Sequence, residues 1–216
     1  MSDYVVDELL SSPDNVEIVR DQICGILALE AAHQYELADK AGDARKEDYK
    51  IKVYLENDQP WELQTEDDKE VFPLVNVSLV SVDRGNGSTT TNKNNVTASF
   101  YIDCYATGTF DGDGQTGRMA VVKAWKTARI IRNILCAANY AYLGLRGVVT
   151  SRQVKSLTAG MPNQQNAAGR VCIVRIAMDV DLLEFSPQVS GVEIAPISLE
   201  FLDDTGLVIV DMDQEE

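Results

Sequence analysis

The sequence predicts an α+β fold: a mixed, mainly antiparallel sheet with two helices packed on one face, plus a C-terminal hairpin or arm. Three observations support it. Two long segments have the apolar spacing of helices, several short segments alternate apolar with polar residues, and the strands are grouped along the chain instead of alternating with helices. With 216 residues, 45% of them hydrophobic, the chain is long enough to bury one sizeable core.

The first helix is expected to begin within residues 11–15. The sequence Ser-Ser-Pro-Asp-Asn offers a hydroxyl N-cap, a proline tolerated in the first turn and an acid favoured by the helix dipole. Apolar residues then recur at helical spacing: Val16, Val19, Ile23, Ile26 and Leu27. The pattern fades near residues 35–37 and Gly42 interrupts it, so we expect a helix of about 25 residues.

Three strands are expected between the helices. Two have apolar residues at alternate positions: Ile51, Val53 and Leu55 in the first, and Val75, Val77 and Leu79 in the second. The third is the clearest, because one face carries Ala98, Phe100, Ile102, Cys104 and Ala106. The acidic run 66–70 is expected to be a solvated loop. The polar stretch 84–95 has little to bury and is expected to be a mobile hairpin loop.

The second helix is expected from residue 118 to about residue 142, ended by Gly144 and Gly147. Its apolar surface is wide, and one stripe includes Trp125, so we expect it to lie across the sheet. Strands follow at 148–157 and 171–183, and a hairpin at 192–210 leads into an acidic tail. We therefore predict a main α+β domain of residues 1–188 and a C-terminal hairpin or arm of residues 189–216.

Charge and composition argue against several classes of partner. The 34 acidic residues outnumber the 19 lysines and arginines, giving a formal charge of −15 that opposes general binding to nucleic acid or anionic lipid. No basic segment followed by an apolar one opens the chain, and no run approaches about 18 apolar residues, so we expect no membrane partner and synthesis in a cytoplasm. The four cysteines are scattered and are expected to be reduced, packed thiols.

No catalytic motif emerges, so we expect neither enzymatic activity nor a cofactor. His33 is the sole histidine and falls on the polar side of the first helix, which leaves no partner for a Ser-His-Asp or Cys-His site. Residues 111–117 resemble a calcium loop, but Thr116 occupies the glycine position and Val122 the glutamate position. The enzymatic alternative is a metal-dependent hydrolase that would use Asp103, Asp111 and Asp113.

The second helix carries the most distinctive charge pattern. Five cations stand there with no acid among them: Arg118, Lys123, Lys126, Arg129 and Arg132. One interpretation is an ordinary solvated helix face. The other is a subunit interface, in which the positive helix meets an acidic patch on an identical neighbour, such as residues 66–70 or the tail from Asp211. On the second interpretation, reversing the charge of Lys126 and Arg129 would block assembly of a folded monomer.

Four segments carry a resemblance to a known family: 100–106 (FYIDCYA), 120–129 (AVVKAWKTAR), 134–135 (IL) and 142–147 (YLGLRG). With the order of elements from the first helix to about residue 185, they resemble the tail terminator, or tail-completion (gpU-like), proteins of tailed phages. The family has no catalytic residues to carry over. The long 84–95 loop and the extension after about residue 188 differ from the smaller members of that family.

The resemblance implies a virion protein of the phage tail or neck, made in the host cytoplasm. Such a subunit forms a homohexameric ring that caps the tail tube, ends its polymerisation and joins it to the head–neck proteins, while DNA passes without specific binding. The departures from the smaller members leave related roles open: a sheath cap, a head-closure protein or a tube protein. A monomeric host-directed binding module is the further alternative.

Overall fold

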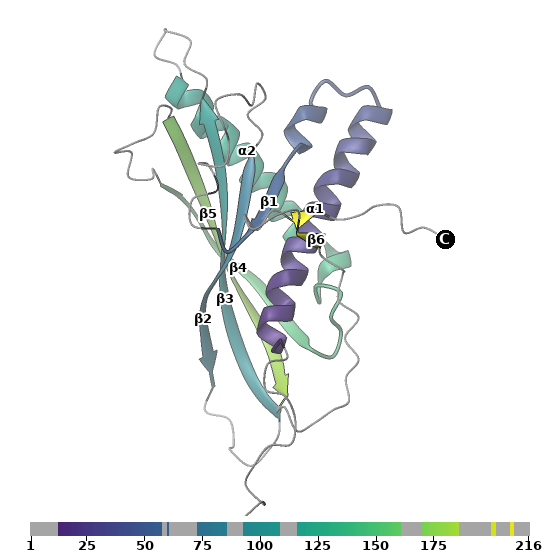
Figure 1. Cartoon of the computed structure of the whole chain (residues 1–216), viewed down its shortest axis with the longest axis vertical. Coiled ribbons are helices and arrows are strands. Elements are labelled where there is room, and N and C mark those ends of the chain that lie inside the picture. Colours follow the sequence, from purple (N-terminus) through teal and green to yellow (C-terminus); the bar gives the residue numbers. More distant parts are fainter. Residues whose placement is uncertain are drawn as a thin grey trace, which may run out of the picture.

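The computed structural model describes residues 13–57, 60, 73–85, 93–108, 116–160, 170–185, 200–201 and 208–209. Two α-helices lie on one face of a five-stranded sheet (Figure 1), which confirms the predicted fold class. The helices are α1 (Asn15–Lys40) and α2 (Thr116–Cys136), with 3-10 turns η1 (Lys46–Tyr49) and η3 (Ala138–Tyr140). The sheet strands are β1 (Lys52–Leu55), β2 (Leu74–Arg84), β3 (Lys93–Gly108), β4 (Val149–Gly160) and β5 (Arg170–Phe185).

The strand order is β1-β2-β3-β5-β4. β1 and β2 are parallel and every other neighbouring pair is antiparallel, so the sheet is mixed and mainly antiparallel as predicted. The central pair β3–β5 runs for 16 residues, from Lys93 opposite Phe185 to Gly108 opposite Arg170. This order leaves β1 and β4 as the two edges of the sheet.

The helices and the even-numbered face of β3 and β5 enclose the core. Phe100 of β3 lies opposite Met178 of β5, and both side chains are fully buried. α2 packs on β3 and β5, and α1 on β1, β2 and β5. The apolar residues predicted for one face of β3 are all buried, as are those predicted for α1. The periodicities of the sequence thus identified the main core correctly.

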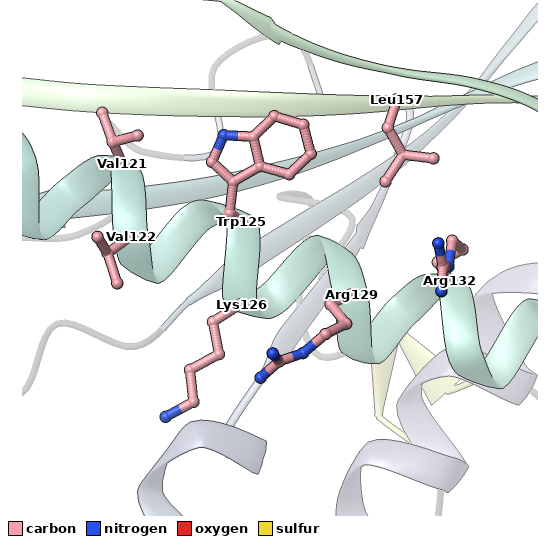
Figure 2. A pocket seen from close by; sticks show the side chains of 7 residues that line it. All are labelled: Val121, Val122, Trp125, Lys126, Arg129, Arg132 and Leu157. Atoms are coloured by element: carbon pink, nitrogen blue, oxygen red, sulfur yellow. The ribbon is translucent and has the colours of Figure 1, made fainter.

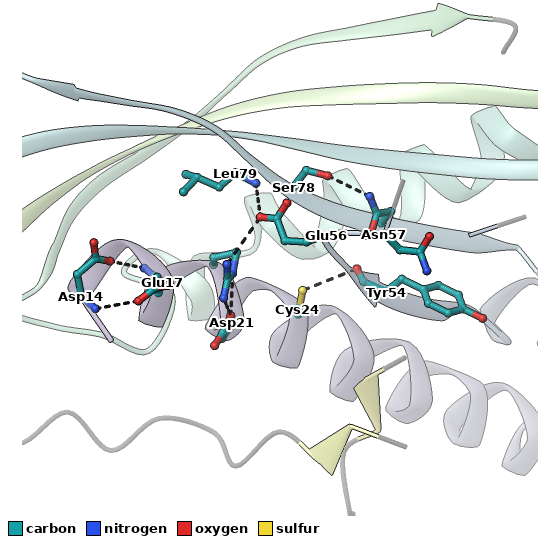
Figure 3. Close-up of polar contacts among 11 residues, drawn as sticks. Asp14, Glu17, Asp21, Cys24, Tyr54, Glu56, Asn57, Ser78 and Leu79 are labelled. Atoms are coloured by element: carbon teal, nitrogen blue, oxygen red, sulfur yellow. Dashed lines mark hydrogen bonds and ion pairs between the residues drawn. The ribbon is translucent and has the colours of Figure 1, made fainter. Parts of the chain in front are cut away.

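A carboxylate, and not the predicted hydroxyl, caps α1. Asp14 accepts a hydrogen bond from the Glu17 backbone N–H at 2.8 Å, while the Glu17 side chain accepts one from the Asp14 N–H at 3.1 Å (Figure 3). This reciprocal pair satisfies two backbone donors at the helix start. Further along the helix, Arg20 lies 3.8 Å from Glu56, whose carboxylate accepts a bond from the Leu79 N–H of β2 (Figure 3).

α2 ends at Cys136, earlier than residue 142, because the next turn is held by β4. The Arg152 guanidinium of β4 donates to the backbone oxygens of Tyr140, at 2.6 Å, and of Ala137, at 2.7 Å. Ala137 is extended, with φ −63° and ψ 138°, so the chain leaves the helix there and forms η3. Burial lowers the pKa of Arg152 from its ordinary value. A contact between distant segments therefore sets this boundary, which local sequence cannot reveal.

Removing this contact should destabilise the fold. Arg152→Ala is expected to lower the free energy of unfolding by about 1–3 kcal/mol, because two carbonyl groups lose a charged donor. Urea unfolding of the purified protein measures the change. Arg129→Ala, an exposed arginine of α2, is the control and should change stability by no more than about 0.5 kcal/mol. Equal stability of the two variants would show that the Arg152 bonds are dispensable.

The other face of the sheet has a small apolar cluster at one end. It consists of Tyr54, Leu74, Tyr105 and Val171, with Ile173 packed against them. Strict alternation predicts Tyr54 and Tyr105 on a solvated face, yet both are buried. Cross-strand neighbours on this face contribute to the burial of one another.

Several predicted loops lie wholly or partly outside the described residues. β2 runs to Arg84 and β3 begins at Lys93, so both ends of the predicted 84–95 loop are strand and only residues 86–92 remain outside. Residues 66–70, 111–113, 161–169 and 211–216 also lie outside. Two short strands, β6 (Glu200–Phe201) and β7 (Val208–Ile209), pair antiparallel within the predicted 192–210 hairpin, and β7 contacts α1 and β1.

Three of the four free cysteines are packed thiols as predicted: Cys24, Cys104 and Cys172 are buried. Burial raises the pKa of each of these thiols, which keeps them protonated at neutral pH. Cys136, at the end of α2, is exposed, so the prediction is wrong for it. Among the described helices, none is long and apolar enough to cross a membrane.

Candidate functional site

A groove of about 540 Å³ lies between the outer side of α2 and the edge strand β4. Its lining residues are Val121, Val122, Trp125, Lys126, Arg129 and Arg132 of α2 and Leu157 of β4. In Figure 2, Trp125 and Leu157 lie on the sheet side of α2, and Lys126 and Arg129 project from its other side. We call this feature the α2–β4 groove. Its floor is apolar and its rim is cationic.

The apolar floor is exposed to an unusual degree. Val122 is 57% exposed and Trp125 is 40% exposed. The predicted apolar stripe included Trp125, which lies on the sheet side of α2 but is only partly buried. The fully buried row of α2 is instead Ala120, Ala124 and Ala128, whose side chains are small. Three alanines one turn apart allow α2 to lie close to β3 and β5, and the larger indole of Trp125 is left at the flank.

The five predicted interface cations do not act as one set. Lys126 pairs with Asp48 of η1 in the same subunit. Arg129 and Arg132 line the groove and make no ion pair with any residue that the structure describes. Lys123 is exposed but does not line the groove, and the side chain of Arg118 lies outside the described part of the chain. Two arginines are therefore available to an anionic partner at the groove.

The second wall of the groove is an edge of the sheet. β4 has 12 residues, and among the described strands its one neighbour is β5. Its register shifts twice, between Val149 and Ser151 and between Val154 and Ser156, and Lys155 pairs with Asp179 at 3.2 Å. Bulges and an edge lysine limit unspecific pairing of a free strand. The remaining edge is nevertheless long enough to receive an extended segment.

The described carboxylates do not form a metal site. Both oxygens of Asp103 accept hydrogen bonds from the Arg175 guanidinium at 2.7 Å, and the Arg175 guanidinium lies 4.1 Å from the Tyr101 ring centroid. Within the described residues, no three His, Cys, Asp or Glu side chains gather as a metal ion requires. Asp111 and Asp113 lie outside those residues. The hydrolase hypothesis used three carboxylates, of which only Asp103 is described, and Asp103 is paired with Arg175.

His33 is exposed on α1, as the sequence predicted. A crevice between the helices contains Glu30, which accepts a hydrogen bond from the Tyr140 hydroxyl at 2.8 Å and one from Gln34 at 2.8 Å. Burial and the bond to Glu30 raise the pKa of Tyr140 to about 12. These contacts join α1 to the chain that follows α2, so the crevice serves the fold.

Sequence reasoning identified the cationic half of the groove and missed the apolar half. Trp125 was assigned to the core, and Val122 and Leu157 were not recognised as surface residues. One signal was present: Met119 and Val122 fall on the same side of α2 as Arg129, away from the alanine row. Apolar residues among exposed cations on a helix indicate a surface that meets a partner.

No protein-family model matches the chain, and no curated protein matches it. Among solved structures, one chain of no stated function has 15% sequence identity and a TM-score of 0.30, with 74% of this chain and 96% of that chain covered. A similarity of this size carries no argument about function. The α2–β4 groove is therefore the feature of the molecule that bears on function.

Proposed function

We propose that this protein is a structural subunit of a tailed-phage virion. Copies of it bind one another in a ring that caps the tail tube, ends tail polymerisation and joins the tail to the head–neck proteins, while DNA passes without specific binding. The observation that carries the proposal is the α2–β4 groove, an exposed apolar surface with two arginines that make no ion pair with the described part of a strongly acidic chain.

Charge gives the first supporting argument. Subunits of charge −15 repel one another, so a ring closes only where apolar contact or local pairing of opposite charge outweighs that repulsion. Trp125 and Val122 offer apolar contact, and Arg129 and Arg132 offer the local positive charge. Exposed tryptophan beside arginine is also the composition typical of the residues that dominate binding energy at interfaces.

Position gives the second supporting argument. Leu157 of the groove belongs to the β4 edge of the sheet, and α1 packs toward the β1 edge. The acids at the end of α1 and in η1 include Asp39, Asp43 and Glu47, each of which pairs with a cation of its own subunit. An interface between two different surfaces of the same subunit generates a ring when its rotation closes. A ring of six is what the resemblance to tail terminators implies, and the tail-end position has the same basis.

The test is the mass and shape of the assembly. Mass photometry and negative-stain electron microscopy of the purified protein, alone and with tail tubes, should detect rings or capped tube ends. Arg129→Glu with Arg132→Glu should weaken assembly by about tenfold or more, because like charges then face the acidic neighbour. Lys126 is left intact because its pairing with Asp48 would confound the result.

A control variant makes the same change in net charge at positions outside the groove. Lys40→Glu with Arg146→Glu alters two exposed cations that lie outside the groove, and this variant should assemble normally. Raising the salt concentration should weaken assembly of the native protein, since exposed charge pairs are screened over about 8 Å at physiological ionic strength. A protein that stays monomeric at high concentration and in the presence of tail tubes would favour a host-directed binding module instead.

A further inference from the structure

We infer that the α2–β4 groove of one subunit binds the acidic segment after β7, residues 210–216, of a neighbouring copy. The inference rests on the proposed function, because it requires a second copy of the chain. It adds the identity of the segment that the groove receives and the direction in which subunits join.

The segment has the chemistry that the groove selects. Its sequence is Val210-Asp211-Met212-Asp213-Gln214-Glu215-Glu216, with two apolar side chains and four acids. In an extended chain, successive side chains point to opposite sides. Val210 and Met212 would then share one side, facing Trp125 and Leu157. The acids at 211, 213 and 215 would share the other, beside Arg129 and Arg132.

The place where the segment starts favours a neighbour over the same subunit. β7 contacts α1 and β1, and β1 is the edge of the sheet opposite β4. Within one subunit, the segment would have to cross the sheet to reach Leu157, the residue of β4 that lines the groove. The α2 side of the groove approaches η1, where Lys126 pairs with Asp48, so the titration in trans decides between the same subunit and a neighbour.

Head-to-tail contact removes this difficulty. When the β1 edge of one subunit lies beside the β4 edge of the next, the segment starts close to the groove that it enters. Among the described strands, β4 has a neighbour on one side only, so its other edge can receive an extended peptide. The surface therefore fits a strand-like occupant, and successive subunits repeat the same contact.

The first experiment measures binding in trans. A fluorescently labelled peptide of residues 206–216 is titrated into the full-length Asp211→Arg, Asp213→Arg variant, whose own tail is repelled by the groove. Anisotropy should show saturable binding. Adding Arg129→Glu and Arg132→Glu should weaken it by about tenfold or more, as should a peptide with its acids replaced by amides. Adding Lys40→Glu and Arg146→Glu should leave it unchanged.

The fluorescence of Trp125 reports directly on binding of the peptide to the groove. The chain has two tryptophans, so Trp61→Phe leaves the indole of Trp125 as the sole tryptophan signal. Because Trp125 is exposed in the free subunit, the peptide should shift its emission to shorter wavelength and protect it from iodide quenching. Binding without change at Trp125 would place the peptide elsewhere and overturn the inference.

The second experiment uses complementary charge reversal. The groove variant (Arg129→Glu, Arg132→Glu) and the tail variant (Asp211→Arg, Asp213→Arg) should each fail to assemble alone. Mixed in equal amounts they should assemble, because each altered partner then meets opposite charge. Unimpaired assembly of the tail variant alone, or no rescue in the mixture, would overturn the inference.

The outcomes separate the inference from the proposed function. If rings form and depend on Arg129 and Arg132 but the peptide does not bind, the proposed function stands, the inference fails, and another acidic segment such as 66–70 becomes the candidate. If the peptide binds the groove but the protein neither forms rings nor caps tail tubes, the segment assignment stands and the tail role fails.

Discussion

Replacing Arg175 by methionine is expected to lower the free energy of unfolding by about 1–3 kcal/mol at neutral pH, because the buried Asp103 carboxylate loses its charged donor while the Arg175 side chain is itself 46% exposed. The Asp103 side chain is 6% exposed and receives both of its short bonds from Arg175. Methionine keeps the apolar stem and removes the charge, so a buried carboxylate is left without its partner. Chemical denaturation at pH 7 measures the loss.

A double variant tests the physical reason for this prediction. Arg175→Met with Asp103→Leu carries no buried charge and should recover most of the stability. No recovery in the double variant would show that the pair does not act through its charge.

Trp125→Ala is expected to have the largest effect on assembly, about 30-fold or more, as tryptophan anchors at interface centres commonly do. The indole contributes much of the apolar floor of the groove and is 40% exposed in the free subunit. The fold should change little because the sheet-facing row of α2 is alanine. Mass photometry across a concentration series measures the shift, and thermal unfolding checks that the subunit is folded.

Met119→Ala is the matched control for that prediction. Met119 is another exposed apolar residue of α2, but it does not line the groove. Its replacement should leave assembly within about twofold of the native protein, since isolated exposed apolar residues are common and neutral. Equal loss of assembly in the two variants would assign the effect to the whole outer face of α2.

The core could be predicted from the sequence because its signal is local. Phe100, Ile102 and Cys104 alternate without interruption, and a period of two allows a single buried face. In α1, Val19 and Ile23 are one helical turn apart, and both are buried on the same face. The number of strands and the side of the sheet that the helices cover follow from such patterns.

The failures share one cause, which is contact between distant segments. The end of α2 depends on Arg152, and the burial of Asp103 depends on Arg175, 72 residues away. Trp125 was misplaced because three alanines nearby fill the sheet-facing row. The cations of the groove could be predicted from the sequence, but only the structure separates Lys126, which is paired with Asp48, from Arg129 and Arg132.

The long central pair β3–β5 has a consequence for synthesis of the chain. Phe100 pairs with Met178, a separation of 178 − 100 = 78 residues. At about 5–20 residues per second, β3 waits several seconds on the ribosome before β5 emerges. During that interval one edge of β3 can pair with β2, and the edge that later pairs with β5 lacks that partner. We therefore expect slow folding and a strong benefit from chaperones that shield nascent chains, with yield improving when translation or temperature is lowered.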